Sequence, residues 1–254
     1  MHPVRDGLLF GATVVAGAIN AIAGGGTLLS FPAALAWGLP SPMANATNAL
    51  AMCPGSLASA WAYRRELSAR GRLAAVLSPP TVVGALAGAA LMHHTPARAF
   101  DAIVPVLVLG ATVLLLLQGL AGRRAEAIEP PSRRRIAGLA AAQFLVGVYG
   151  GYFGAAMGIV MLALLALLPG HIQTRVAVKN LLSAAANGVA AIYFVASGLV
   201  DPRAAVIMVP AAIVGGYAGG HFARRASQGM VRGLVVTIGL GVSALLGYRA
   251  IVGR

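Results

Sequence analysis

Charged residues are scarce in this chain, and their scarcity argues against a soluble protein. Of the 254 residues, 59% are hydrophobic and only 10% are charged, whereas about a quarter of a soluble domain is charged. Cysteine occurs once, as Cys53, so neither an internal disulfide nor a cysteine-based metal cluster can form. Small residues are abundant, with 33 glycines, and they permit close helix contact in lipid. We therefore expect an all-α integral membrane protein.

Acidic residues are few, and none lies in the middle of an apolar run. The six acids are Asp6, Glu66, Asp101, Glu126, Glu129 and Asp201, in loops or at the ends of runs. Carriers coupled to Na⁺ or protons often need a carboxylate inside the membrane, so a cation substrate is disfavoured. No HExxH motif or mid-span Asp pair indicates an enzyme, and no metal or cofactor is expected.

Basic residues are in excess, and they gather in short gaps between apolar runs. The net charge is +13, with clusters at 64-RRELSARGR-72 and 133-RRR-135. This pattern is typical of cytoplasmic loops in membrane proteins. Nucleic-acid binding is not supported, because no basic patch interleaved with aromatic residues is present. A lipid bilayer is the expected surrounding, in a multi-pass protein of the plasma membrane (the inner membrane in a bacterium).

Eight apolar stretches follow one another along the chain. Six can cross a bilayer as straight helices, at 43–63, 73–92, 102–121, 176–200, 204–223 and 230–248. The other two, 7–38 and 136–169, are interrupted by 24-GGG-26 and 150-GGYFGAAMG-158. The pieces on either side of each interruption are too short to cross alone. Each stretch is therefore predicted to form two half-helices that meet at a break near the membrane middle.

The two halves of the chain resemble one another. Identical residues recur at offsets of 130 to 132, including Gly17 and Gly147, Gly24 and Gly154, Asn48 and Asn180, and Pro79 and Pro210. We therefore divide the chain into a first transmembrane repeat (1–121), a charged linker (122–135) and a second repeat (136–254). Whether each glycine-broken helix crosses the membrane or is re-entrant stays open, because the Lys and Arg distribution fits both. Inverted repeats are preferred, since they are common among secondary transporters.

Glycine breaks at matching places in two halves are typical of a transporter binding site. A half-helix N-terminus offers unpaired N–H groups and a positive dipole end to an anion. After the first break, at Gly24, Gly25 and Gly26, these donors are expected at Thr27 and Leu28. After the second break, at Gly154, they are expected near Ala156 to Ile159, which includes Met157. The alternative is that these small residues serve only helix packing.

Polar side chains accompany both breaks. They are Asn20, Asn45, Thr47 and Asn48 in the first half, and Lys179, Asn180 and Asn187 in the second. The amides supply neutral donors, and their alternative role is hydrogen bonding between helices. Lys179 is a charge within an apolar span, so it is a functional candidate. Its alternative role is to extend to the headgroups.

These residues carry a resemblance to a known family. The stretch 20-NAIAGGGTLLSFPAALAWGLPSPMANATNAL-50 resembles the signature of the sulfite exporter TauE/SafE permeases, and 178-VKNLLSAAANGVAAIYFVASGLVD-201 is similar to that family's second repeat. The resemblance implies a permease, commonly an exporter, for a small anion such as sulfite, a sulfonate or a related organic acid. A channel-like anion conductor is the alternative. Homo-oligomer formation stays open.

Overall fold

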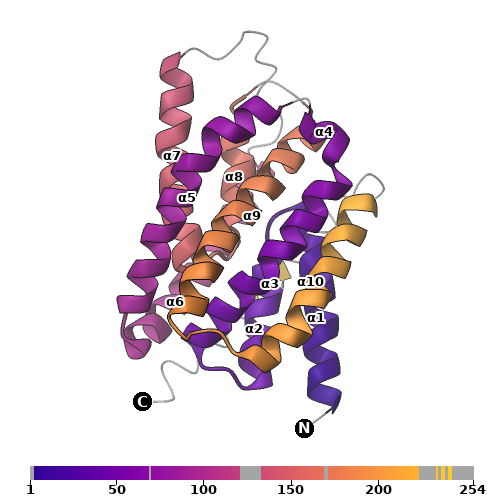
Figure 1. Cartoon of the computed structure of the whole chain (residues 1–254), viewed down its shortest axis with the longest axis vertical. Coiled ribbons are helices and arrows are strands. Elements are labelled where there is room, and N and C mark those ends of the chain that lie inside the picture. Colours follow the sequence, from indigo (N-terminus) through magenta and orange to yellow (C-terminus); the bar gives the residue numbers. More distant parts are fainter. Residues whose placement is uncertain are drawn as a thin grey trace.

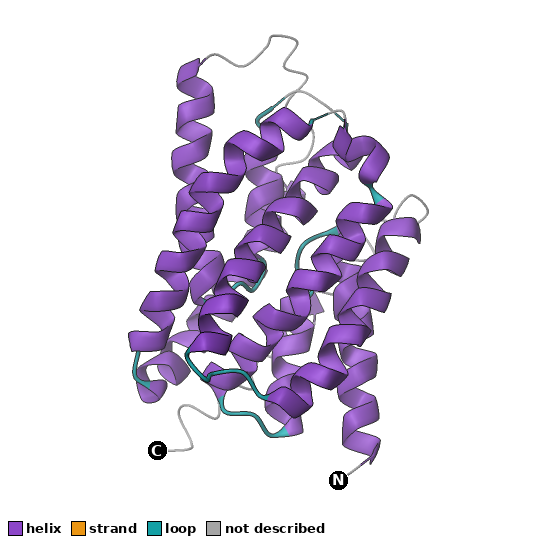
Figure 2. Cartoon of the chain, in the orientation of Figure 1, coloured by secondary structure: helices purple, strands orange, loops and turns teal. Residues whose placement is uncertain are grey.

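The computed structural model of the chain describes residues 3–68, 70–120, 133–168 and 171–222, together with 233, 236, 237, 240 and 241. Its helices are α1 (Pro3–Ile22), α2 (Thr27–Trp37), α3 (Ser41–Ala62), α4 (Arg64–Ser68), α5 (Gly71–His94), α6 (Ala97–Leu120), α7 (Arg133–Tyr152), α8 (Met157–Leu165), α9 (Ile172–Ala196) and α10 (Pro202–Phe222) (Figure 1). All regular structure in these ranges is helical (Figure 2), which confirms the predicted all-α fold.

Two predicted segments fall partly or wholly beyond these ranges. The predicted run 230–248 lies largely outside the described residues, and so does most of the predicted linker. Residues 133–135, which the linker was predicted to include, form the first turn of α7.

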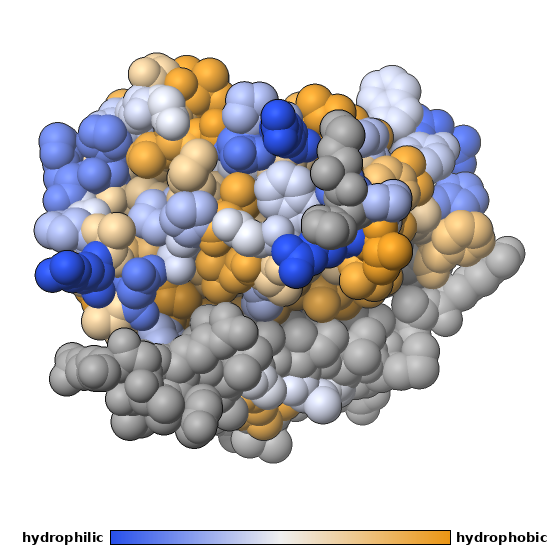
Figure 3. Space-filling view, turned by 90° about the horizontal axis from the view of Figure 1, so that it is seen from below, coloured by the Kyte–Doolittle hydropathy of each residue, from blue (hydrophilic) through white to orange (hydrophobic). Residues whose placement is uncertain are grey.

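Four of the described helices, α1, α5, α9 and α10, are long and apolar enough to cross a membrane. Large apolar side chains cover their outer faces: Val4, Leu8, Ile192 and Val206 are each more than two-thirds exposed. Such exposure is unfavourable in water and expected in lipid. At the end that carries the N-terminus, hydrophilic residues lie among the apolar ones (Figure 3). The exposed apolar side chains are those of a protein embedded in a bilayer.

The first glycine-containing stretch is a helical hairpin. Helix α1 ends at Ile22 and α2 begins at Thr27, and Gly24 between them has a φ of 87°, which favours glycine. Helix α2 then runs back along α1. This path is shown by a hydrogen bond of 2.7 Å that Trp37 Nε1, at the end of α2, donates to Asp6 Oδ1, near the start of α1. The tip of this first hairpin lies midway along the length of the molecule (Figure 2).

The second glycine-containing stretch has the same form and the opposite direction. Helix α7 ends at Tyr152 and α8 begins at Met157, and Gly154 has a φ of 73°. An Arg135 guanidinium nitrogen donates to the Leu167 carbonyl oxygen at 2.6 Å, so α8 returns toward the start of α7. The first hairpin opens toward the end that carries the N-terminus, and the second opens toward the other end (Figure 1).

Helices from the two parts of the chain are interleaved. Helix α10 packs on α1 and α3, whereas α5 packs on α7 and α9. These contacts are close: a Cβ at Gly17 would lie 2.8 Å from the Ala212 carbonyl oxygen, and one at Gly147 would lie 2.6 Å from the Thr81 carbonyl oxygen. The result is a first bundle (α1, α2, α3 and α10) and a second bundle (α5, α7, α8 and α9), which meet along α3 and α9.

Candidate functional site

The tips of the two hairpins touch in the centre of the molecule. A Cβ at Gly24 would lie 2.5 Å from the backbone carbonyl carbon of Gly158, and one at Gly158 would lie 2.7 Å from the Gly24 Cα. Neither position has room for a side chain, since carbon atoms pack at about 3.5–4.0 Å. The segments that the sequence singles out in each half are thus brought into direct contact.

Lys179 lies at this junction and is completely buried. Its ammonium group donates to the Asn20 carbonyl oxygen at 2.5 Å and to Asn180 Oδ1 at 2.6 Å. Its Cδ would lie 3.0 Å from a Cβ placed at Gly158. The side chain therefore points into the protein, and the alternative that it extends to the headgroups does not hold in this structure.

The carbonyl end of α1 explains how an ammonium group is accommodated there. The last C=O groups of a helix lack intrahelical partners and carry the negative end of the helix dipole. The Asn20 carbonyl accepts from Lys179, and the Ala21 carbonyl accepts from Asn180 Nδ2 at 3.2 Å. Among the described residues no acid forms an ion pair with Lys179. Since an ammonium has three donors, one remains without a described acceptor.

The second hairpin tip receives a similar contact from the first part of the chain. Asn45 Nδ2, on α3, donates to the Tyr152 carbonyl oxygen at the end of α7 at 3.0 Å. Asn187 lies beside the same tip, since its Oδ1 is 4.0 Å from a Cβ placed at Gly154. Ala156, just before α8, has a φ of 58°, a strained conformation of the kind that concentrates at functional sites.

The N-terminus of α2 presents the donors that the sequence predicts. Leu28 N donates to the Gly25 carbonyl oxygen at 3.1 Å, and Ser30 N donates to the Gly26 carbonyl oxygen at 3.2 Å. The preceding N–H groups, of Gly25, Gly26 and Thr27, donate to no described backbone acceptor. Unpaired N–H groups at a helix start are suited to an oxyanion.

The remaining predicted residues support the hairpins. Asn20 Nδ2 donates to Ser56 Oγ at 3.2 Å. Asn48 Oδ1 accepts from Ser30 Oγ at 2.6 Å and so joins α3 to α2. Met157 is buried, with its Cγ 3.1 Å from a Cβ placed at Gly150.

Thr47 is the predicted site residue that the structure places elsewhere. Its Oγ1 accepts from the backbone N–H of Asp201, just before α10, at 3.0 Å. Sequence reasoning missed Ser56 and Ser30, which hydrogen-bond Asn20 and Asn48. Gly158 lies in the stretch Ala156 to Ile159 that the sequence singles out, whereas its contact with Gly24 joins segments too far apart in the chain for spacing to predict.

Comparison with known proteins assigns this arrangement to a family. The family model of the sulfite exporter TauE/SafE matches residues 9–246. The chain belongs to this family. Among its curated relatives is a probable membrane transporter protein, YfcA, of Escherichia coli K12, which is 31% identical over 253 residues, or 98% of this chain and 91% of the relative. No solved structure matches the chain.

Two more distant relatives extend the same assignment. A probable membrane transporter protein of Haemophilus influenzae is 26% identical over 246 residues, covering 95% of this chain and 94% of its own. Another, the probable membrane transporter protein ORF9 of a Sinorhizobium species, is 25% identical over 239 residues, which cover 94% of this chain and 90% of the relative. This TauE/SafE chain is a multi-pass membrane transporter and not an enzyme.

Proposed function

We propose that this transporter moves a small oxyanion, such as sulfite, a sulfonate or a related organic acid, across the plasma membrane, which is the inner membrane in a bacterium. The observation that carries the proposal is Lys179, a fully buried cation that makes no ion pair with any described acid. Burying an unpaired charge costs several kcal/mol, so a functional benefit is expected to offset it. The name of the family, sulfite exporter TauE/SafE, supports this class of cargo.

The geometry of the junction supports an anion rather than a cation. The ammonium of Lys179, on α9, contacts the Asn20 carbonyl at the end of α1, and the unpaired N–H groups of Gly25 to Thr27 belong to the hairpin tip that follows. The amides of Asn180 and Asn187 lie on the same helix as Lys179. All these groups can donate hydrogen bonds to an oxyanion, and no carboxylate competes for them among the described residues.

Two inverted repeats, 1–121 and 136–254, form part of the proposal. Helices α1 and α7 end 130 positions apart, at Ile22 and Tyr152, and α2 and α8 begin 130 positions apart. The close contact of Gly17 with Ala212 also has a counterpart between Gly147 and Thr81. The opposite directions of the two hairpins support inversion (Figure 1).

A carrier is favoured over a channel. The contact between Gly24 and Gly158 leaves no room even for a methyl group where the two hairpin tips meet. A continuous anion passage through that point would require the tips to separate. A carrier that opens by moving the first bundle against the second along α3 and α9 needs no permanent passage.

The test is transport by the purified protein in liposomes. We expect saturable uptake of sulfite or an alkanesulfonate, and we expect stimulation when the same anion is preloaded on the other side. Sodium and potassium salts of one anion should give equal rates, and protein-free liposomes are the control. Anion flux without stimulation by preloaded substrate would support the channel, and no flux of any sulfur oxyanion or carboxylate would contradict the proposal.

A second prediction concerns orientation. The end that bears Arg64, Arg65 and 133–135 (Figure 1) should lie in the cytoplasm, because Lys and Arg accumulate there. Single cysteines are introduced at exposed positions in a Cys53→Ala background, as Ser68→Cys at this end or as Ala97→Cys at the opposite end. In intact cells an impermeant maleimide should label only Ala97→Cys, and after permeabilisation it should label both. The reverse pattern would invert the assigned orientation.

A further inference from the structure

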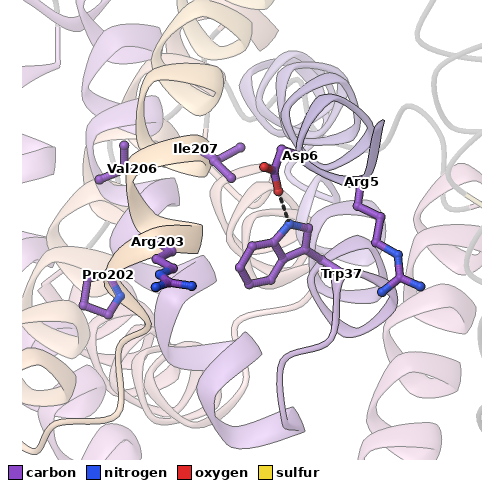
Figure 4. A pocket seen from close by; sticks show the side chains of 7 residues that line it. All are labelled: Arg5, Asp6, Trp37, Pro202, Arg203, Val206 and Ile207. Atoms are coloured by element: carbon purple, nitrogen blue, oxygen red, sulfur yellow. Dashed lines mark hydrogen bonds between the residues drawn. The ribbon is translucent and has the colours of Figure 1, made fainter. Parts of the chain in front are cut away.

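A pocket of about 540 Å³ lies at the open end of the first hairpin (Figure 4). Arg5 and Asp6 of α1 and Trp37 of α2 form one wall, and Arg203, Val206 and Ile207 of α10 are on the other. The volume is within the range of about 300–1,000 Å³ that holds small molecules. It is separate from the hairpin tips, because its lining residues begin α1 and α10 and end α2.

Two unpaired guanidinium groups give the pocket its charge. Neither Arg5 nor Arg203 makes a hydrogen bond or ion pair with a described residue, whereas the Asp6 carboxylate accepts from Trp37 Nε1. The two arginines lie on opposite sides of the Trp37 indole (Figure 4). Each stands in the first turn of its helix, where the dipole disfavours a cation. They therefore add nothing to helix stability there and are available to an anion.

The rest of the pocket is apolar and faces the bilayer. Val206 is 75% exposed, and on α1, which also lines the pocket, Val4 and Leu8 are 73% and 68% exposed. In a membrane protein such side chains contact acyl chains. A ligand that suits both parts has an anionic head and an apolar chain.

We propose that this pocket binds an anionic phospholipid of the surrounding bilayer. The headgroup lies against the Trp37 indole, with Arg5 on one side and Arg203 on the other to pair with phosphate oxygens through their planar forks, and an acyl chain runs along Val206 and Ile207. Both arginines begin membrane-spanning helices, so they stand at the depth of the headgroups. The proposal is independent of what the transporter carries.

Trp37 provides a reporter inside the pocket. The chain has two tryptophans, so a Trp61→Phe variant leaves Trp37 as the single indole, which can be excited selectively. The purified variant is placed in vesicles that contain increasing fractions of phosphatidylglycerol or phosphatidylcholine with brominated acyl chains, which quench nearby indoles. We expect brominated phosphatidylglycerol to quench Trp37 at lower mole fractions than brominated phosphatidylcholine.

Substitutions then test the role of the arginines. Arg5→Gln or Arg203→Gln should each weaken the preference for phosphatidylglycerol about fivefold, as expected for one charge near an anionic lipid, and the double variant should abolish it. Arg98→Gln is the matched control, because Arg98 is exposed at the same end and does not line the pocket. Its preference should equal that of the Trp61→Phe parent.

Three outcomes would overturn the proposal. Equal quenching by the two brominated lipids would show that the headgroup charge is not recognised. A preference that survives in the double variant would place the lipid elsewhere. Saturable quenching by a brominated alkanesulfonate added to phosphatidylcholine vesicles, without any preference for phosphatidylglycerol, would assign the pocket to a free amphiphile. None of these results depends on transport, so the lipid site and the proposed function can fail separately.

Discussion

Replacing Lys179 with glutamine should reduce anion transport at least tenfold, or about 1.4 kcal/mol in barrier or apparent affinity. Glutamine retains donors that can reach the Asn20 carbonyl, but it removes the only buried charge at the junction among the described residues. The substitution also removes the desolvation cost of a buried charge that has no described ion-pair partner. We therefore expect the thermal midpoint of the purified protein to stay the same or rise while the flux in liposomes falls.

Two further variants make this result specific. Lys179→Arg should retain part of the flux, because the charge is kept while its planar fork fits the site less well. Arg98→Gln removes an exposed positive charge far from the junction and should leave the flux unchanged. Near-wild-type flux in Lys179→Gln, at equal amounts of folded protein, would mean that Lys179 only caps the carbonyl end of α1.

The second large effect is expected for Gly158→Ala. The new methyl group would lie 2.7 Å from the Gly24 Cα and 3.0 Å from the Lys179 Cδ, so the hairpin tips must move apart by about 1 Å to restore ordinary contact distances. Overpacking of this kind costs about 1–3 kcal/mol. We expect the thermal midpoint to fall by several degrees, and the flux to fall further because Lys179 is displaced.

Gly138→Ala is the matched control for this substitution. Gly138 is also helical, in α7, but a Cβ there would meet nothing within 4 Å. The exchange of glycine for alanine should be neutral or slightly stabilising at that position. If Gly158→Ala behaved like Gly138→Ala in both stability and flux, the two hairpin tips would not be in contact in the membrane.

Much of the helical pattern could be predicted from local sequence. The glycine clusters mark the breaks in the two stretches, and α3, α5, α6, α9 and α10 lie within a few residues of predicted runs. The path of the broken stretches could not be predicted, because the basic residues fit both a crossing and a return. The contacts that show the return, Asp6 with Trp37 and Arg135 with Leu167, join residues about thirty positions apart, beyond any local periodicity.

The environment of Lys179 shows a second limit of prediction from the sequence. Its position in an apolar span is evident from the sequence, and its functional importance stays a prediction. Its contact with the carbonyl end of α1 depends on how α9 packs against a helix 159 positions earlier in the chain. A half-helix has an N-terminal donor end and a C-terminal acceptor end, and sequence spacing does not tell which end a distant lysine will meet.

The interleaving of helices also constrains how the chain is made. Helix α10 supplies a packing surface for both α1 and α3, yet it is synthesised last among these three. At about 5–20 residues per second, the ribosome reaches α10 roughly seven to thirty seconds after it has completed α3. During this interval the glycine-lined faces of α1 and α3 have only lipid, or the membrane insertion machinery, to cover them. We therefore expect nascent chains to be kept apart from their neighbours until α10 has been inserted.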